Sequence, residues 1–271
     1  MKNLNHTRIF MYNIVLVATL FFTSCPDAVE QNAGAQCLQI KQKYGIVVEK
    51  IVRTSQLPSS IVFRQKNKET TLELIPPTKA QFFNYLKILN LALAKYPASL
   101  LAKHLDLVYI GGGYRENGGI ITGLYEKRKL YLFYNHSQGD NSDAFLEQTF
   151  HHEFSSILIQ AYNFPAFEWL AQNPKNFDYI INPIKINEYM NSITTYHPNK
   201  AQLEQGLVSS YGKANAENDI NTYAELVFTD PEKIQSYIST YPIIKQKYIV
   251  LKTFYLSISP HFGKFFTAEI N

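Results

Sequence analysis

The amino-acid sequence predicts an α+β fold, with a mixed or antiparallel sheet in the N-terminal half and a mainly helical C-terminal half. Runs of β-branched and aromatic residues are concentrated before residue 135. From about residue 142 onwards, apolar residues recur at helical spacing. The order of strands, one helix, more strands and then helices favours α+β over an alternating parallel fold.

Residues 38–75 are predicted to contain the first strands. Four short apolar runs carry this prediction: 46–48, 51–52, 61–63 and 72–75. A polar segment at 67–69 separates the last two runs and predicts a hairpin. Pro76 and Pro77 end it, because proline cannot continue a ladder of backbone hydrogen bonds.

A helix is predicted to follow, with Thr78 as its N-cap. Its apolar residues share one face: Phe82, Tyr85, Leu86, Leu89 and Leu93. Pro97 and a short turn then lead to a strand at 107–110. Residues 120–125 and 130–134 are predicted to pair as antiparallel strands across a polar turn.

The next helix is expected to begin at Ser142 or Asp143 and to run to about Tyr162. Its apolar residues fall on one side: Phe150, Phe154, Ile157, Leu158 and Ala161. Beyond Pro165 the pattern is mainly helical with long loops.

The N-terminus is typical of an export signal. Lys2 and Arg8 precede a short apolar run at 14–22, which ends in Phe22-Thr23-Ser24-Cys25. This ending resembles a bacterial lipobox, in which the cysteine is acylated. We therefore expect a signal peptide at 1–24, lipidation of Cys25, a tether at 25–37 and one domain at 38–271. The alternatives are an ordinary cleaved signal and an uncleaved anchor.

These assignments predict an exported protein, lipid-anchored to the bacterial cell envelope at the outer membrane. Removing two positive charges with residues 1–24 lowers the net charge from +4 to near +2. This total is too small to indicate nucleic acid as a partner or strong steering to anionic lipid. Cys37 would be the one remaining thiol, which leaves no internal disulfide.

The segment most informative about function is Thr149-Phe150-His151-His152-Glu153-Phe154-Ser155-Ser156. In an H-E-x-x-H helix, two histidines four residues apart bind zinc and the glutamate activates water. His152 and Glu153 match this motif, but Ser156 stands where the second histidine is required. His151 lies about 100° round the helix from His152 and cannot replace it simply.

The stretch from Phe150 to Gln160 resembles the H-H-E-F-A-H-I-L-H-Q segment of zinc-binding metallopeptidase lipoproteins of Bacteroidetes. The family's later pattern of G-F-V-S-x-Y followed by E-D-F-A-E is similar to Gly206-Leu207-Val208-Ser209-Ser210-Tyr211 and then residues 217–225. The resemblance covers roughly residues 78–235. It implies a zincin-like fold with an active-site helix, and peptide-bond hydrolysis by a metal-activated water.

The resemblance also implies roles for individual residues. Glu153 would be the general base, Tyr211 would stabilise an oxyanion, and His152 would bind zinc. The glutamate expected as third ligand aligns with Asn218, so that Glu217 or Asp219 would have to reach the metal instead. Glu225, further along the same helix, is a weaker candidate.

Two functions remain open from the sequence. The first is a metallopeptidase that acts on a peptide or protein substrate through an atypical metal site. The second is an inactive zincin-like pseudoenzyme that binds a peptide, a glycan or an envelope partner. A structural envelope component is the third class, and it would not bring residues 152, 153 and 217–219 together.

Overall fold

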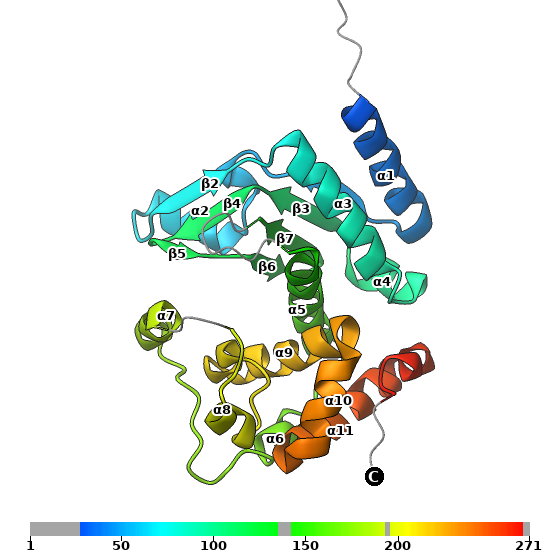
Figure 1. The fold of residues 1–271 in the computed structure, drawn as a ribbon. Coiled ribbons are helices and arrows are strands. Elements are labelled where there is room, and N and C mark those ends of the chain that lie inside the picture. Colours follow the sequence, from blue (N-terminus) through cyan, green and yellow to red (C-terminus); the bar gives the residue numbers. More distant parts are fainter. Residues whose placement is uncertain (1–27, 135–141, 193–195, 268–271) are drawn as a thin grey trace, which may run out of the picture.

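A computed structural model describes residues 28–134, 142–192 and 196–267 of the 271-residue chain. These residues form a mixed α+β fold, as the sequence predicts. Both sheets lie in one half of the molecule, and the C-terminal helices lie in the other (Figure 1). The proposed signal peptide and Cys25 lie outside the described residues.

Sheet A has four strands in the order β1 (Val47–Lys50), β3 (Leu107–Gly111), β7 (Lys129–Phe133) and β6 (Gly123–Glu126). The pairs β1–β3 and β3–β7 are parallel, whereas β6 and β7 are antiparallel. The predicted pairing of the last two strands is therefore confirmed. The position of β6 at the end of this order makes it an edge strand.

Sheet B is smaller and antiparallel, in the order β2 (Leu72–Ile75), β4 (Gly113–Glu116) and β5 (Gly119–Ile120). Two further elements belong to this region: η1 (Thr54–Gln56) and α2 (Ser59–Lys66). A small apolar cluster joins them to one face of sheet A, with Ile61, Tyr114, Tyr131 and Phe133 at its centre.

The other face of sheet A is covered by helices. They are α1 (Ala28–Tyr44), α3 (Lys79–Leu93), α4 (Ala98–His104) and α5 (Asp143–Ala161). The predicted cap of α3 is confirmed, because Thr78 and Gln81 exchange side chain to backbone hydrogen bonds at 3.2 and 2.8 Å. Ser142 caps α5 by accepting from the backbone N–H of Phe145.

The C-terminal half is helical, as predicted. It contains α6 (Ala166–Leu170), α7 (Pro183–Ser192), α8 (Lys200–Glu204), η2 (Ser210–Lys213), α9 (Ala216–Thr229), α10 (Pro231–Thr240), α11 (Pro242–Ile258) and η3 (Pro260–Lys264). Helix α9 packs along α5. The large core is continuous from sheet A through α5 to these helices.

Four predictions in the N-terminal region are wrong. The expected tether is the helix α1 from Ala28 onwards, and residues 61–63 lie in α2 instead of in a hairpin strand. Residues 51–52 follow the end of β1, and the expected turn after Pro97 is the helix α4. Within the described ranges, no helix is both long enough and apolar enough to span a bilayer.

Candidate functional site

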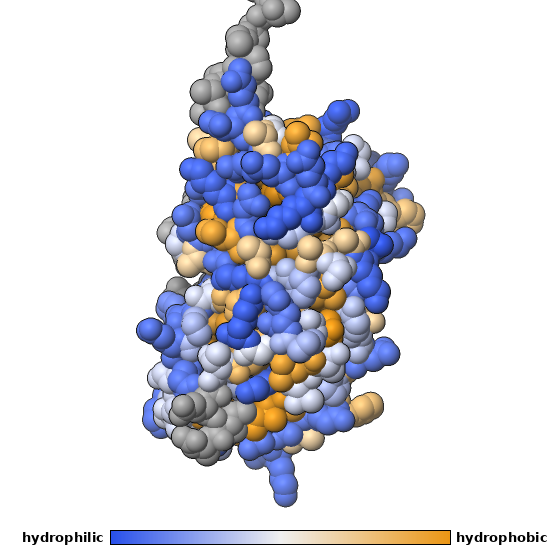
Figure 2. Space-filling model, turned by 90° about the vertical axis from the view of Figure 1, so that its right-hand side faces the viewer, coloured by the Kyte–Doolittle hydropathy of each residue, from blue (hydrophilic) through white to orange (hydrophobic). Residues whose placement is uncertain are grey.

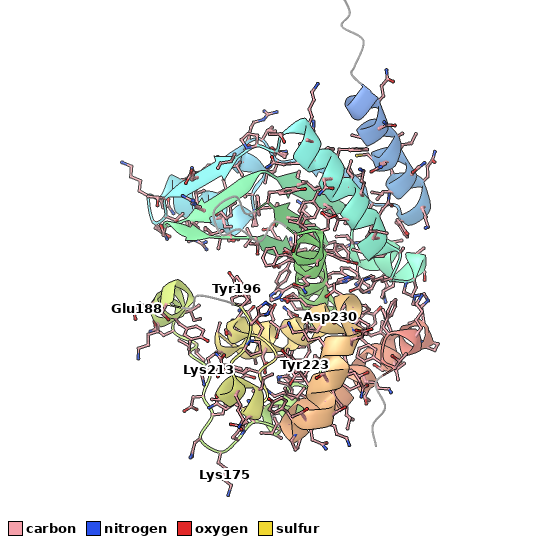
Figure 3. All side chains as sticks on the ribbon, viewed as in Figure 1. Lys175, Glu188, Tyr196, Lys213, Tyr223 and Asp230 are labelled. Atoms are coloured by element: carbon pink, nitrogen blue, oxygen red, sulfur yellow. The ribbon has the colours of Figure 1, made fainter. Side chains whose placement is uncertain are left out.

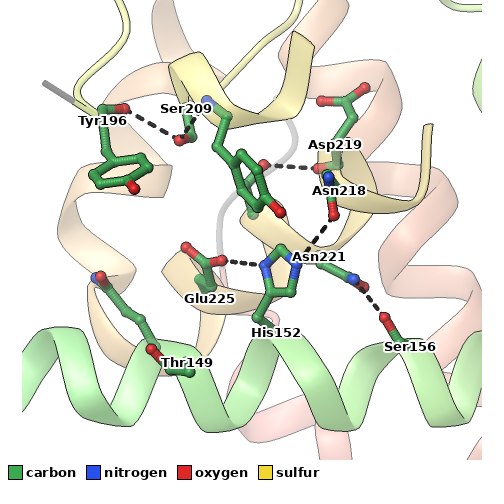
Figure 4. Close-up of polar contacts among 12 residues, drawn as sticks. Thr149, His152, Ser156, Tyr196, Ser209, Asn218, Asp219, Asn221 and Glu225 are labelled. Atoms are coloured by element: carbon green, nitrogen blue, oxygen red, sulfur yellow. Dashed lines mark hydrogen bonds and ion pairs between the residues drawn. The ribbon is translucent and has the colours of Figure 1, made fainter. Parts of the chain in front are cut away.

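The candidate site lies where α5 and α9 face each other (Figure 4). His152 and Ser156 are one turn apart on α5. Asn218, Asn221 and Glu225 occupy one face of α9, because they are spaced at i, i+3 and i+7. The two polar stripes contact each other through three hydrogen bonds.

His152 is the centre of this contact. Its Nδ1 lies 2.5 Å from Oε1 of Glu225, and its Nε2 lies 3.3 Å from Oδ1 of Asn218. The ring of Tyr211 stacks on the imidazole, with 5.5 Å between the ring centroids. Both ring nitrogens of His152 are therefore engaged, and only 8% of the residue is exposed.

The charge of Glu225 determines the protonation of His152. Burial lowers the pKa of this imidazole, but the hydrogen bond and the charge of Glu225 outweigh burial and raise the pKa to about 9. The charge of Glu153 and the hydrogen bond that His152 donates to Oδ1 of Asn218 act in the same direction. A pKa raised in this way favours the imidazolium form, which has no lone pair to offer a metal ion.

Glu153 is also nearly buried, with 9% exposure, and its carboxylate makes no hydrogen bond with the described residues. It lies against Gly123 at the start of β6, where an added Cβ would be 2.5 Å from Oε1 of Glu153. A larger residue at position 123 would therefore displace the carboxylate of Glu153. Burial raises the pKa of Glu153 to about 7, opposed by the charge of His152 and assisted by the charges of Glu217 and Glu225.

Ser156 occupies the position of the missing second histidine. Its hydroxyl accepts a hydrogen bond of 2.7 Å from Nδ2 of Asn221. Glu217 lies in a neighbouring contact, where its Oε1 accepts a hydrogen bond of 2.8 Å from the hydroxyl of Tyr125. That hydroxyl in turn accepts from Nε2 of Gln160 at 2.6 Å.

Asp219 belongs to a different network, which is centred on its own buried carboxylate. Its Oδ2 accepts three hydrogen bonds, from Lys247 at 2.7 Å, from Tyr179 at 2.7 Å and from the indole of Trp169 at 3.1 Å. Lys247 also donates to the carbonyl oxygen of Gly206. Asp219 and Lys247 have no exposed side-chain surface.

The structure thus brings together only part of the predicted site. Tyr211 stacks on His152, and Glu153 is the next residue along α5. Glu217 and Asp219 are engaged in other contacts, and their places beside His152 are taken by Asn218 and Glu225. The family resemblance aligns Asn218 with a metal-ligand position, but no role was predicted for Asn218 itself. The i, i+7 spacing of residues 218 and 225 was the signal that could have identified this pair.

The residues around His152 do not fit a zinc ion. Protein zinc sites use histidine, cysteine and carboxylate ligands, whereas here the two groups nearest the motif positions are a serine hydroxyl and an amide oxygen. Among the described residues, no group of three or more His, Cys, Asp or Glu side chains could hold a metal ion. His152 itself is committed to Glu225.

Comparisons with known proteins give no match: no protein-family model, no curated protein and no solved structure is similar to this chain.

The pairing of His152 with Glu225 makes a direct prediction. In a Glu225→Gln variant, the pKa of His152 should fall clearly below about 9, because burial lowers it and the largest opposing contribution, that of Glu225, is lost. An NMR titration of the imidazole resonances measures this value. Glu217→Gln is the matched control, because it removes a negative charge that acts on the adjacent Glu153 but no hydrogen bond to His152. Equal effects of the two substitutions would contradict the assignment.

Proposed function

We propose that this chain is a lipid-anchored, zincin-like pseudoenzyme, which binds a protein segment beside α5 without hydrolysing it. The observation that carries the proposal is the pairing of His152 with Glu225 and Asn218. A metallopeptidase needs this imidazole to be neutral and free to bind zinc. Here both ring nitrogens lie within hydrogen-bond distance of other side chains, and the contact with Glu225 favours the protonated ring.

The remainder of the H-E-x-x-H pattern supports the same proposal. Serine keeps its proton at neutral pH and is a poor ligand for zinc, and Ser156 already accepts a hydrogen bond from Asn221. Asn218 provides a neutral amide oxygen where the resemblance requires a carboxylate. In this proposal the chain has the fold of the hydrolase, but two of the three metal-ligand positions, 156 and 218, carry side chains that do not bind zinc.

A protein segment is the partner that the surroundings favour. Strand β6 is an edge of sheet A, and an edge strand presents backbone N–H and C=O groups to which an extended peptide can pair. Glu153 lies against the first residue of this strand. The carboxylate of Glu217, which makes no ion pair among the described residues, would favour a segment with a basic side chain.

The proposal is tested by rebuilding the ligand set. In a Ser156→His/Asn218→Glu variant, two zinc ligands would be restored beside His152. We expect this variant to bind one zinc ion per chain, and the unchanged protein to bind none, after dialysis against micromolar zinc. Metal content by mass spectrometry gives both values.

Two controls sharpen this test. Adding His152→Ala to the rebuilt variant should remove the zinc, which shows that the ion occupies the intended position. Placing the histidine and the glutamate instead at the exposed positions Ser239 and Asn67 gives a variant of matched composition without the ligand geometry, which should bind no zinc. Stoichiometric zinc in the unchanged protein would contradict the proposal.

The alternative function, an active metallopeptidase, predicts instead that the unchanged protein binds a metal ion. The observation that favours it is the pKa of Glu153, which burial raises to about 7, close to the value of an effective general base at neutral pH. If the chain is a metallopeptidase, a divalent ion should copurify with it, and a peptide library should be cleaved in a metal-dependent manner. Glu153→Gln would then abolish cleavage while the metal stays bound.

A further inference from the structure

The layer of helices α1, α3 and α4 is positively charged, although the net charge of the whole chain is small. Residues 31–48 and 74–105 contain no aspartate or glutamate, whereas they contain six lysines. They are Lys41, Lys43, Lys79, Lys87, Lys95 and Lys103. The three helices pack together on one face of sheet A, so that these charges share one side of the molecule (Figure 1).

Four of these lysines are exposed and free of carboxylate partners. Lys41, Lys43, Lys87 and Lys103 are exposed, and none of them forms an ion pair within the described part of the chain. By contrast, Lys95 is partly covered and pairs with Glu147. Figure 2 shows that hydrophilic residues dominate the upper half of this side.

Two further features of this face suit a layer of lipid headgroups. Leu38 of α1 and Leu91 of α3 are exposed apolar side chains on these helices, with 55% and 63% exposure. A hollow of about 410 Å³ is lined by Gln39, Gln42, Lys43 and Asn90. Carboxamide and ammonium groups donate hydrogen bonds to phosphate oxygens.

The proposed anchor, Cys25, is close to α1 in the sequence. Only residues 26 and 27 separate Cys25 from the first residue of α1, so the chain between Cys25 and Ala28 spans at most about 11 Å. Helix α1 is itself packed against α3 and α4, with Ile40 and Tyr44 fully or almost fully buried. A lipid attached to Cys25 would therefore hold this layer of helices near the bilayer.

We propose that the α1–α3–α4 face docks on a bilayer surface that contains anionic phospholipid. This inference rests on the lipid anchor of the proposed function and adds an orientation to it. Each lysine near an anionic bilayer raises the partition constant about fivefold, and the effect decreases with salt. Four unpaired lysines then fix which side of the domain faces the membrane, while the acyl chains keep it there.

The test uses the full lipidated chain in two kinds of vesicle, one of phosphatidylglycerol and phosphatidylethanolamine in equal parts and one of phosphatidylcholine alone. Exposed lysines are acetylated with a water-soluble reagent and quantified by peptide mass spectrometry. In the anionic vesicles at low salt, Lys41, Lys87 and Lys103 should react at least about fivefold more slowly, and 0.5 M salt should reverse this. Lys175, at the opposite end from α1 (Figure 3), should react equally in both.

Two double variants with the same change in net charge show whether protection depends on the lysines of this face or only on the net charge of the protein. Lys87→Glu/Lys103→Glu should abolish the protection of Lys41, whereas Lys175→Glu/Lys185→Glu should leave it intact. Equal acetylation of Lys41 in the two kinds of vesicle would overturn the proposal. Slow acetylation in both vesicles and in detergent would also overturn it, because a second copy would then cover the face.

Failure of the anchor is detected separately. A mature chain whose intact mass shows no acyl groups contradicts the lipidation of Cys25, whatever the lysines do.

Discussion

Replacing Lys247 by methionine is expected to destabilise the folded protein by about 3–5 kcal/mol, the cost of leaving one charge of a buried ion pair without its partner. Lys247 and Asp219 have no exposed side-chain surface, and their charged atoms are 2.7 Å apart. Methionine fills a similar volume, so that the loss reports on charge more than on packing. Two neutral donors, Tyr179 and Trp169, would be all that remains on Oδ2 of Asp219.

The network joins several elements, which explains why the effect should be large. Lys247 of α11 also donates to the carbonyl oxygen of Gly206, and Tyr223 of α9 donates to the same oxygen at 2.8 Å. Gly206 has a φ of +84°, and a Cβ there would lie 2.3 Å from Ile243. Only glycine suits both the backbone and the space at this position.

Urea denaturation followed by far-ultraviolet circular dichroism measures the change in the free energy of unfolding. Lys252→Met, on the same helix at a partly exposed position, should change it by less than about 0.5 kcal/mol. Lys247→Met/Asp219→Asn should recover part of the loss, because no buried charge then remains. A loss below about 1 kcal/mol for Lys247→Met would show that the pair contributes little.

Glu153→Gln is expected to make the protein less sensitive to alkaline pH. The pKa of Glu153 is about 7 in the folded protein against 4.5 for an ordinary glutamate, mainly because the carboxylate is buried. Between these two values the folded state holds a proton that the unfolded state has lost. The free energy of unfolding therefore falls as the pH rises from about 4.5 to 7, by about 3 kcal/mol.

Glutamine cannot ionise, so the free energy of unfolding of the Glu153→Gln variant does not fall for this reason. Relative to the unchanged protein, the free energy of unfolding of the variant should increase by about 3 kcal/mol between pH 4.5 and pH 8. Urea denaturation at a series of pH values gives this difference. Glu168→Gln, at an exposed position of α6, is the control for the substitution of glutamate by glutamine itself. A constant difference for Glu153→Gln would mean that this carboxylate titrates normally.

The sequence was sufficient for elements whose local signals agree with their packing. Helix α3 has its capping residues and an uninterrupted apolar stripe, and β6 and β7 are separated by a short polar turn. Helix α5 has Ser142 as its cap and a buried stripe through Phe150 and Phe154. In these cases propensity, capping and burial all point to the same structure.

The failures occur where local preference and packing disagree. Residues 61–63 have the β-branched and aromatic composition of a strand, yet α2 needs only Ile61 to be buried against the small apolar cluster. Helix α1 is mostly polar and buries only Ala33, Ile40 and Tyr44 along its described residues. Its stability comes from packing on α3, which no local pattern reveals.

The site was predicted to the level of the helix but not of the residue. A shift of one position in α9 turns a side chain by about 100°. Asn218 therefore faces His152, whereas Asp219 enters the network of Lys247. Polarity alone could not distinguish these two neighbours, because both are buried or half-buried and both are hydrogen-bonded. Their partners on α5 and α11 are far away in the sequence.

The buried network around Asp219 provides its own optical probe. Trp169 is the single tryptophan of the chain and has no exposed surface. Its indole N–H donates to Asp219, and the ammonium group of Lys247 lies 5.2 Å from its ring centroid. The emission of an indole depends on nearby charges. Fluorescence excited at a wavelength that tyrosine does not absorb therefore reports the state of this one ion pair.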